Sequence, residues 1–102
     1  MIMMPKEEII QKLEKNQARI RQFGVQKITL FGSYARDEAD RNSDMDFLVQ
    51  FGEGRGLYDD YSGLLSFLHS LFKAKIDLVK PSLIRKELRE EILGGMQIEA
   101  KV

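Results

Sequence analysis

The chain has 102 residues, of which 43% are hydrophobic and 31% charged, a composition typical of a single soluble globular domain. Its 16 Lys and Arg balance its 16 Asp and Glu, and this zero net charge argues against avid binding to nucleic acid or to an anionic membrane. It has no cysteine, which excludes disulfides and cysteine-ligated zinc and suits a cytoplasmic protein. No apolar run approaches the roughly 20 residues that span a bilayer.

The first half of the chain predicts a helix followed by two strands. Pro5 suits the first turn of a helix, whose apolar residues recur at helical spacing until Gly24 ends it. Residues 25–31 are rich in β-branched side chains and predict a strand. A short helix over 33–39 and a polar turn then lead into a second strand over 44–51.

The second half predicts a helix and a strand, then a further helix and strand. Three glycines within residues 52–56 indicate a mobile loop. Residues 57–72 predict a helix, 75–80 a strand, 81–93 a last helix and 96–101 an edge-type strand. Helices that alternate with strands predict an α/β (α+β) fold, in which helices flank a small mixed β-sheet within one domain that spans the chain.

Two aspartates open the second predicted strand. Asp44 and Asp46 are two positions apart, so their side chains would share one face of that strand, with Met45 on the other. Two carboxylates on one face repel each other and lose hydration, and a divalent cation that carries a nucleotide phosphate would offset that cost. The alternative is a solvent-facing strand entrance, in which Ser43 and Asp44 are turn residues.

A third aspartate, Asp77, lies among apolar residues of the strand predicted over 75–80. If this strand lies beside the strand that carries Asp44 and Asp46, three carboxylates converge, and Mg²⁺ favours such oxygen ligands. Asp44 and Asp46 would then hold the metal that carries the nucleotide. Asp77 would complete a second metal site or activate the attacking hydroxyl.

The Gly32–Ser33 pair ends the first predicted strand. A turn from a strand into a helix presents free backbone N–H groups to an anion, Gly32 allows close approach, and Ser33 adds a hydroxyl. The alternative is an ordinary helix start with Ser33 as its cap. Arg36, about one helical turn later, would face phosphate or form a surface ion pair with Asp37 or Asp40.

The three tyrosines of the chain are candidate stacking partners for a nucleotide base. They are Tyr34, Tyr58 and Tyr61. Core packing is the more ordinary role of each, and it is the one that we expect here.

Together these residues resemble the minimal nucleotidyltransferases of the DNA polymerase β superfamily. The family pattern is a Gly-Ser turn, an Asp-x-Asp pair on the next strand and a third Asp on a later strand, here Gly32–Ser33, Asp44-x-Asp46 and Asp77. The resemblance extends from about residue 24 to residue 93. It implies a nucleotidyltransferase core that uses Mg²⁺ and ATP, with Gly32 and Ser33 at the phosphates and the three aspartates as the metal-binding triad.

The resemblance also implies a partner. Such small proteins often pair with a HEPN-domain RNase toxin and act as antitoxins by transferring AMP to a toxin tyrosine. The chain length leaves no room for a domain that binds the acceptor, so we expect the acceptor to be a partner or to be held by one.

One position departs from the family. Where the family commonly has a glycine, this chain has Asp37, which adds negative charge near the phosphate site and removes backbone freedom. Two hypotheses follow. The first is a Mg²⁺-dependent nucleotidyltransferase that modifies a partner protein; the alternative is a noncatalytic antitoxin that neutralises its partner by contact.

Overall fold

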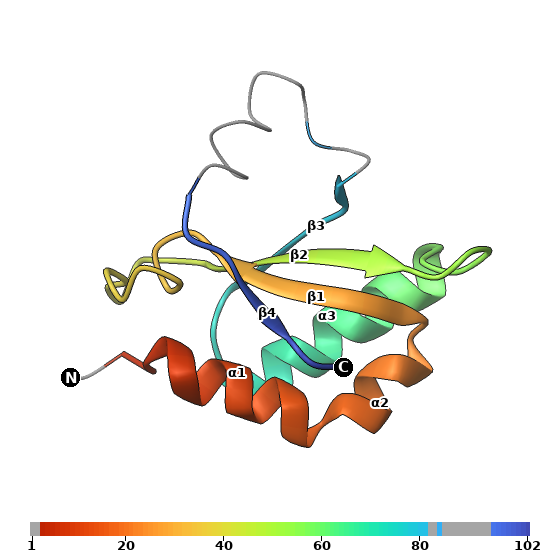
Figure 1. The fold of residues 1–102 in the computed structure, drawn as a ribbon, viewed down its shortest axis with the longest axis horizontal. Coiled ribbons are helices and arrows are strands. Elements are labelled where there is room, and N and C mark those ends of the chain that lie inside the picture. The colour runs from red at the N-terminus through yellow and green to blue at the C-terminus, as the bar shows by residue number, and fades with distance from the viewer. Residues whose placement is uncertain (1–2, 82–83, 85–94) are drawn as a thin grey trace.

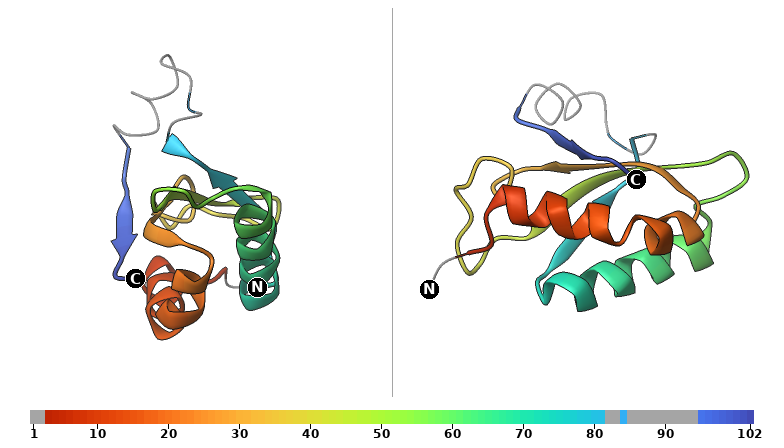
Figure 2. Two further views of the ribbon diagram at one scale, coloured as in Figure 1. Left: turned by 90° about the vertical axis from the view of Figure 1, so that its right-hand side faces the viewer. Right: turned by 60° about the horizontal axis from the view of Figure 1, so that its bottom comes forward.

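The computed structural model describes residues 3–81, 84 and 95–102. In these residues a four-stranded sheet has the strand order β3-β2-β1-β4, and helices cover one of its faces (Figures 1 and 2). The elements in chain order are α1 (Lys6–Lys15), α2 (Gln17–Gln22), β1 (Val25–Phe31), β2 (Met45–Phe51), α3 (Tyr58–Phe72), β3 (Ile76–Val79) and β4 (Ile98–Ala100). The predicted mixed α/β fold is confirmed.

The sheet is mixed because α3 returns the chain to β3 in the direction of β2. Strands β1 and β2 pair antiparallel, β2 and β3 pair parallel, and β4 pairs antiparallel with the free side of β1. The predicted fourth strand is therefore confirmed as an edge strand. The prediction of a last helix over 81–93 falls almost entirely outside the described residues.

The N-terminal helix is broken where the sequence predicts a continuous one. Asn16 separates α1 from α2 with a non-helical backbone (φ −107°, ψ 21°). Its side-chain Nδ2 donates a 2.7 Å hydrogen bond to the carbonyl of Lys12, which the Asn16 backbone N–H also approaches at 3.2 Å. A side chain that competes in this way with the helical backbone weakens the helix. The break leaves Leu13 and Ile20, on either side of it, fully buried.

The core lies between the helices and one face of the sheet. Strand residues alternate, so β1 and β2 turn one set of side chains toward the helices and the other set away from them. The set that joins the helical core from these two strands comprises Val25, Ile28, Leu30, Met45, Phe47 and Val49. Asp46 lies between two members of that set, and the alternation therefore places its side chain on the face opposite the helices.

The segment between β1 and β2 is a series of turns rather than the predicted short helix. The backbone amides of Ala35 and Arg36 donate to the carbonyls three residues earlier, at 3.1 and 3.2 Å. Asp37 has a left-handed backbone (φ +54°), which ends any helix before a second turn can form. Strand β2 begins at Met45, so Asp44 precedes the strand by one residue.

Among the described residues, no helix has both the length and the apolar character that crossing a membrane requires.

Candidate functional site

The parallel pairing of β2 with β3 brings two of the three aspartates side by side. Asp46 and Asp77 are direct register partners in the sheet. Just before them, the backbone amide of Met45 donates a 2.8 Å hydrogen bond to the carbonyl of Lys75, which ties the first residue of β2 to the entrance of β3. Periodicity alone left open whether Asp77 approaches Asp46, and the register settles that it does.

Asp46 is a strongly perturbed carboxyl group. Partial burial, the charges of Asp77 and Asp44 and a hydrogen bond with Asp77 together raise its pKa from 3.8 to about 6, and Arg36 opposes the rise. Burial is the largest of these causes, and the two neighbouring carboxylates come next. The structure therefore concentrates negative charge at the start of β2 and β3, where a bound cation would relieve the repulsion.

Gly32 brings the predicted phosphate turn against this acidic group. It follows Phe31, whose register partner is Asp46, and its backbone is left-handed (φ +76°). A Cβ atom at Gly32 would overlap Oδ2 of Asp46. Glycine is therefore required here both by the backbone conformation and by the close approach of the carboxylate. The turn therefore lies directly against Asp46.

Buried residues hold the turn after Gly32 in place. Tyr34 and Ala35 are 6% and 0% exposed and belong to the core. The amide of Glu38 donates a 2.9 Å hydrogen bond to the carbonyl of Ser33, which closes the turn. Ser33 is thus followed by two buried residues, and the expectation that Tyr34 packs in the core is confirmed.

Arg36 forms a surface ion pair, but with neither of the predicted partners. Its Nε lies 3.0 Å from Oε2 of Glu38, rather than at Asp37 or Asp40. The positive charge nevertheless acts on the acidic group, because it lowers the pKa of Asp46 against the larger raising effects. The guanidinium of Arg36 therefore acts electrostatically on Asp46 from the turn.

Asp37 lies in the turn but is engaged elsewhere. Its Oδ1 accepts a 3.1 Å hydrogen bond from the backbone amide of Lys6, and its Oδ2 lies 3.6 Å from Nζ of the same residue. The residue before α1, Pro5, supplies no side-chain cap, so Asp37 caps this helix from 31 residues away. The charge of Asp37 is thus compensated, and its left-handed backbone is the conformation that a glycine would favour.

The donor set fits a magnesium ion. Asp44, Asp46 and Asp77 offer carboxylate oxygens, which Mg²⁺ prefers, and Asp46 and Asp77 are register partners in the sheet. In the part of the chain that the structure describes, no three acidic or imidazole side chains are already grouped closely enough to coordinate an ion. Coordination by all three aspartates would therefore require their carboxylates to move closer together.

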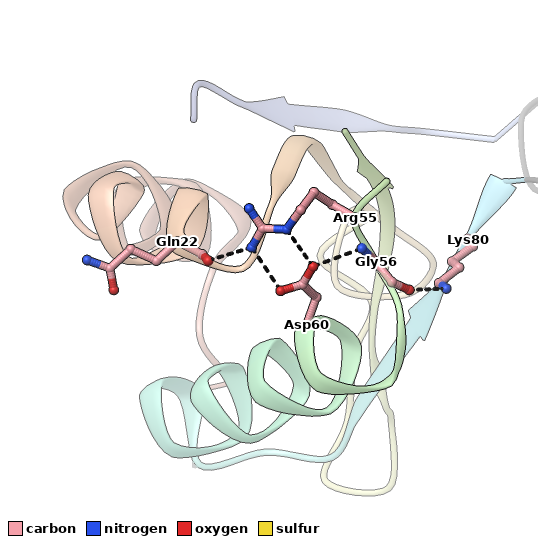
Figure 3. Close-up of polar contacts among 5 residues, drawn as sticks. All are labelled: Gln22, Arg55, Gly56, Asp60 and Lys80. Atoms are coloured by element: carbon pink, nitrogen blue, oxygen red, sulfur yellow. Dashed lines mark hydrogen bonds and ion pairs between the residues drawn. The ribbon is translucent and has the colours of Figure 1, made fainter. Parts of the chain in front are cut away.

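A second polar cluster fastens the loop that the glycines predict to be mobile. Arg55 contacts both carboxylate oxygens of Asp60 at 2.8 and 2.9 Å and donates to the carbonyl of Gln22 at 2.9 Å (Figure 3). The amide of Gly56 also donates to Asp60, at 2.9 Å. These contacts, first with Arg55 and then with Gly56, lower the pKa of Asp60 to about 2. We call this group of residues the loop clamp.

The loop clamp was missed by the sequence analysis, although a signal for it exists. Arg55 and Asp60 flank a glycine at the start of a predicted helix, where an acidic side chain commonly satisfies free backbone amides. The clamp continues to the residue that follows β3, because Nζ of Lys80 donates to the carbonyl of Gly56 (Figure 3). The same ammonium group lies 5.5 and 5.6 Å from the ring centroids of Phe51 and Tyr61.

Comparison with known proteins decides the family. Residues 6–98 match the nucleotidyltransferase domain family. The chain belongs to this family. A protein adenylyltransferase, MntA of Thermococcus cleftensis, is 36% identical over 94 residues, which cover 91% of this chain and 94% of the relative. A solved structure assigned as a minimal nucleotidyltransferase is 33% identical, with a TM-score of 0.75 over 91% of this chain and 94% of the other.

More distant structures share the fold of this nucleotidyltransferase. One is a complex of an MNT antitoxin with a tri-AMPylated HEPN toxin from Shewanella oneidensis. It matches with a TM-score of 0.59 at 22% identity, over 88% of this chain and 70% of the other. The predicted family, fold and enzyme class are therefore confirmed.

Proposed function

We propose that this nucleotidyltransferase is a Mg²⁺-dependent protein adenylyltransferase that transfers AMP from ATP to a hydroxyl group of a partner protein. The observation that carries the proposal is the pairing of Asp46 with Asp77 directly beside the Gly32 turn. This arrangement joins an acidic group suited to a metal–triphosphate with a backbone turn suited to phosphate. The relative from Thermococcus cleftensis, named a protein adenylyltransferase, supports a protein as the acceptor.

Each residue of the site has a proposed role that follows from its position. Gly32 and Ser33 would hold the departing phosphates, and Asp44 and Asp46 would hold the nucleotide-bearing metal. Mg²⁺, when bound, would supply neutralisation of the charge that develops on the triphosphate. Asp77 would complete the metal site or accept the proton of the attacking hydroxyl. The hydroxyl oxygen bonds to the α-phosphorus as the bond to the β-phosphate breaks, and pyrophosphate leaves.

Arg36 would add positive charge on the phosphate side of the site. Its guanidinium pairs with the exposed Glu38, so it would have to exchange this partner for a phosphate oxygen. Charge-assisted contacts of arginine with phosphate are among the stronger hydrogen bonds, which makes such an exchange favourable.

We further propose that the partner is a HEPN-type toxin and that the accepting hydroxyl belongs to a tyrosine. The support is the shared fold with an MNT antitoxin found in complex with a tri-AMPylated HEPN toxin. We also propose that the protein acts in the cytoplasm, where ATP is available to the reaction.

The test is transfer of label from α-³²P-ATP to a HEPN protein encoded beside this chain. We expect label on the partner with Mg²⁺, none with EDTA and none with Asp77→Asn. Asp59→Asn, which changes an exposed aspartate of α3, is the matched control and should transfer normally. Absence of transfer by the folded wild-type chain would reject the proposal. Neutralisation of the toxin by an Asp44→Asn, Asp46→Asn double variant would favour inhibition by contact.

A further inference from the structure

A pocket at the edge of the sheet lies at the end of β3, the strand that carries Asp77, and none of the proposed catalytic residues lines it. Its volume is about 500 Å³, within the range of small-molecule sites. It is formed by the start of α3 and the end of β3, and its lining is Gly56, Leu57, Tyr58, Tyr61, Leu78, Val79 and Lys80. Most of these side chains are apolar or aromatic, and Lys80 supplies a positive charge.

The order of the strands leads from the proposed phosphate turn to the sheet edge that carries this pocket. The phosphate turn follows β1, Asp46 is on β2, Asp77 is on β3, and β3 is the edge of the sheet. A nucleotide whose terminal phosphates lie at Gly32 and whose α-phosphate lies over Asp46 and Asp77 therefore directs its ribose toward the β3 edge.

The distance along β3 suits a nucleoside. Val79 lies two residues beyond Asp77 on the same face of the strand, about 7 Å away at the rise of a β-strand. A ribose can bridge this span. The two sites also interact electrostatically, since the charge of Asp77 adds to burial in raising the pKa of the Tyr61 hydroxyl.

The pocket offers an exposed apolar surface beside a fixed aromatic ring. Leu57 and Tyr58 are 75% and 82% exposed, and with Met96 they are the large apolar side chains most open to solvent among the described residues. Tyr61 is fixed, because its hydroxyl donates a 2.7 Å hydrogen bond to the carbonyl of Leu78. The expected core role thus holds for Tyr61 but is wrong for Tyr58.

The loop clamp gives the pocket a preformed wall. Asp60 holds the amide of Gly56, and Lys80 donates to the carbonyl of the same residue (Figure 3). An ammonium group has three donors, so Lys80 retains donors for acceptor atoms of a ligand. A site held in this way loses little conformational freedom on binding.

We propose that this pocket binds the nucleobase of the substrate, as a purine that stacks on Tyr58 and accepts a hydrogen bond from Lys80. The inference rests on the proposed function, since it assigns the base of the same nucleotide. A peptide strand added to the β3 edge fits less well. Strand β3 has four residues, and the carbonyl of Leu78 is already bonded to Tyr61.

The test separates the base from the phosphates. Calorimetry would measure the dissociation constants of Mg²⁺ complexes of α,β-methylene ATP, which cannot release pyrophosphate, and of inorganic tripolyphosphate. Tyr58→Ala should weaken binding of the ATP analogue by about 5- to 100-fold, because base stacking typically contributes that much, and leave tripolyphosphate binding unchanged. Met96→Ala, which removes an exposed side chain outside the pocket, should change neither.

Three outcomes would overturn the inference. Tyr58→Ala could bind the ATP analogue as tightly as the wild type does. The wild type could bind the analogue no more tightly than tripolyphosphate. Tyr58→Ala could instead weaken only the complex with the partner protein, which would make the pocket a protein docking site. None of these outcomes depends on AMP transfer. If nucleotide binding required Tyr58 but no AMP were transferred, the proposed reaction would be rejected and the assignment of the pocket would stand.

Discussion

Asp46 and Asp60 are both partly exposed aspartates, and the fold perturbs them in opposite directions. Burial and the carboxylates of Asp77 and Asp44 raise the pKa of Asp46 to about 6. The guanidinium of Arg55 and the amide of Gly56 lower the pKa of Asp60 to about 2. The ordinary value for both is 3.8. Asp60 is thus satisfied within the chain, whereas the negative charge of Asp46 is disfavoured by burial and by neighbouring carboxylates.

The difference separates a carboxylate that is paired within the fold from one that we propose serves a ligand. Asp60 accepts from both the side chain of Arg55 and the backbone of Gly56, so its negative charge is used locally. Asp46 is the register partner of another aspartate and touches the space that a side chain at Gly32 would fill. Strain of this kind is characteristic of functional sites.

The largest effect is expected from neutralising the acidic pair. Asp46→Asn or Asp77→Asn should lower AMP transfer by at least about a thousandfold, because electrostatic stabilisation and metal binding carry most of phosphoryl-transfer catalysis. Asp46→Asn should also stabilise the metal-free protein, since it removes repulsion at a partly buried site. Labelled transfer and urea unfolding measure the two effects. A variant that loses both activity and stability would show that Asp46 has a structural role instead.

The next effect concerns the close approach of Gly32 to Asp46. Gly32→Ala should destabilise the fold by about 2 to 3 kcal/mol, because a left-handed alanine costs about 1 to 2 kcal/mol and the Cβ also displaces the carboxylate. Transfer should fall as well. Gly54→Ala is the matched control: its φ is +74°, and nothing lies within 4 Å of the added Cβ. Gly54→Ala should lower the free energy of unfolding only by the cost of a left-handed alanine, and it should leave AMP transfer unchanged. Equal unfolding free energies for the two variants would contradict the contact.

The sequence revealed the acidic region better than the loop clamp for a physical reason. Aspartate is depleted in strands, so Asp46 and Asp77 stand out in an apolar run, and alternation assigns their face. Their adjacency required strand pairing, which periodicity does not specify. Arg55 and Asp60 lie where charged residues are common, and the contact of Arg55 with Gln22 joins segments 33 residues apart. Likewise, the Asp37–Lys6 contact, from the turn to α1, depends on tertiary structure.

A smaller effect is the pH dependence of stability, which should have opposite signs for the two aspartates. Since the folded pKa of Asp46 is about 6, the native state retains a proton that the unfolded state loses above about 4, so stability should fall as pH rises from 4 to 6. Solvent screening at this half-buried site limits the change to about 1 kcal/mol. For Asp60, stability should be lost as pH falls from 4 toward 2.

Urea unfolding between pH 2 and 7 checks both signs in one series. Asp46→Asn should flatten the profile only between pH 4 and 6, and Asp60→Asn only below pH 4. Asp59→Asn, which changes an exposed residue of α3, should leave the pH dependence of stability unchanged in both ranges. If stability of Asp46→Asn still fell between pH 4 and 6, titration of Asp46 would not be the source of that fall.

The smallest effect is expected at Asp37, the position that departs from the family. Asp37→Gly should relieve a left-handed backbone worth about 1 kcal/mol but lose the contacts to Lys6, so the unfolding free energy should change by less than about 0.5 kcal/mol. Asp37→Ala keeps the strain and loses the contacts, and should destabilise the fold by about 1 kcal/mol. Because the carboxylate already pairs with Lys6, neither variant should change labelled AMP transfer by more than about twofold. A large gain in AMP transfer with both variants would instead show that the charge of Asp37 acts on the phosphates. Asp37 would then differ from both Asp46 and Asp60, because its carboxylate would oppose binding of the ligand.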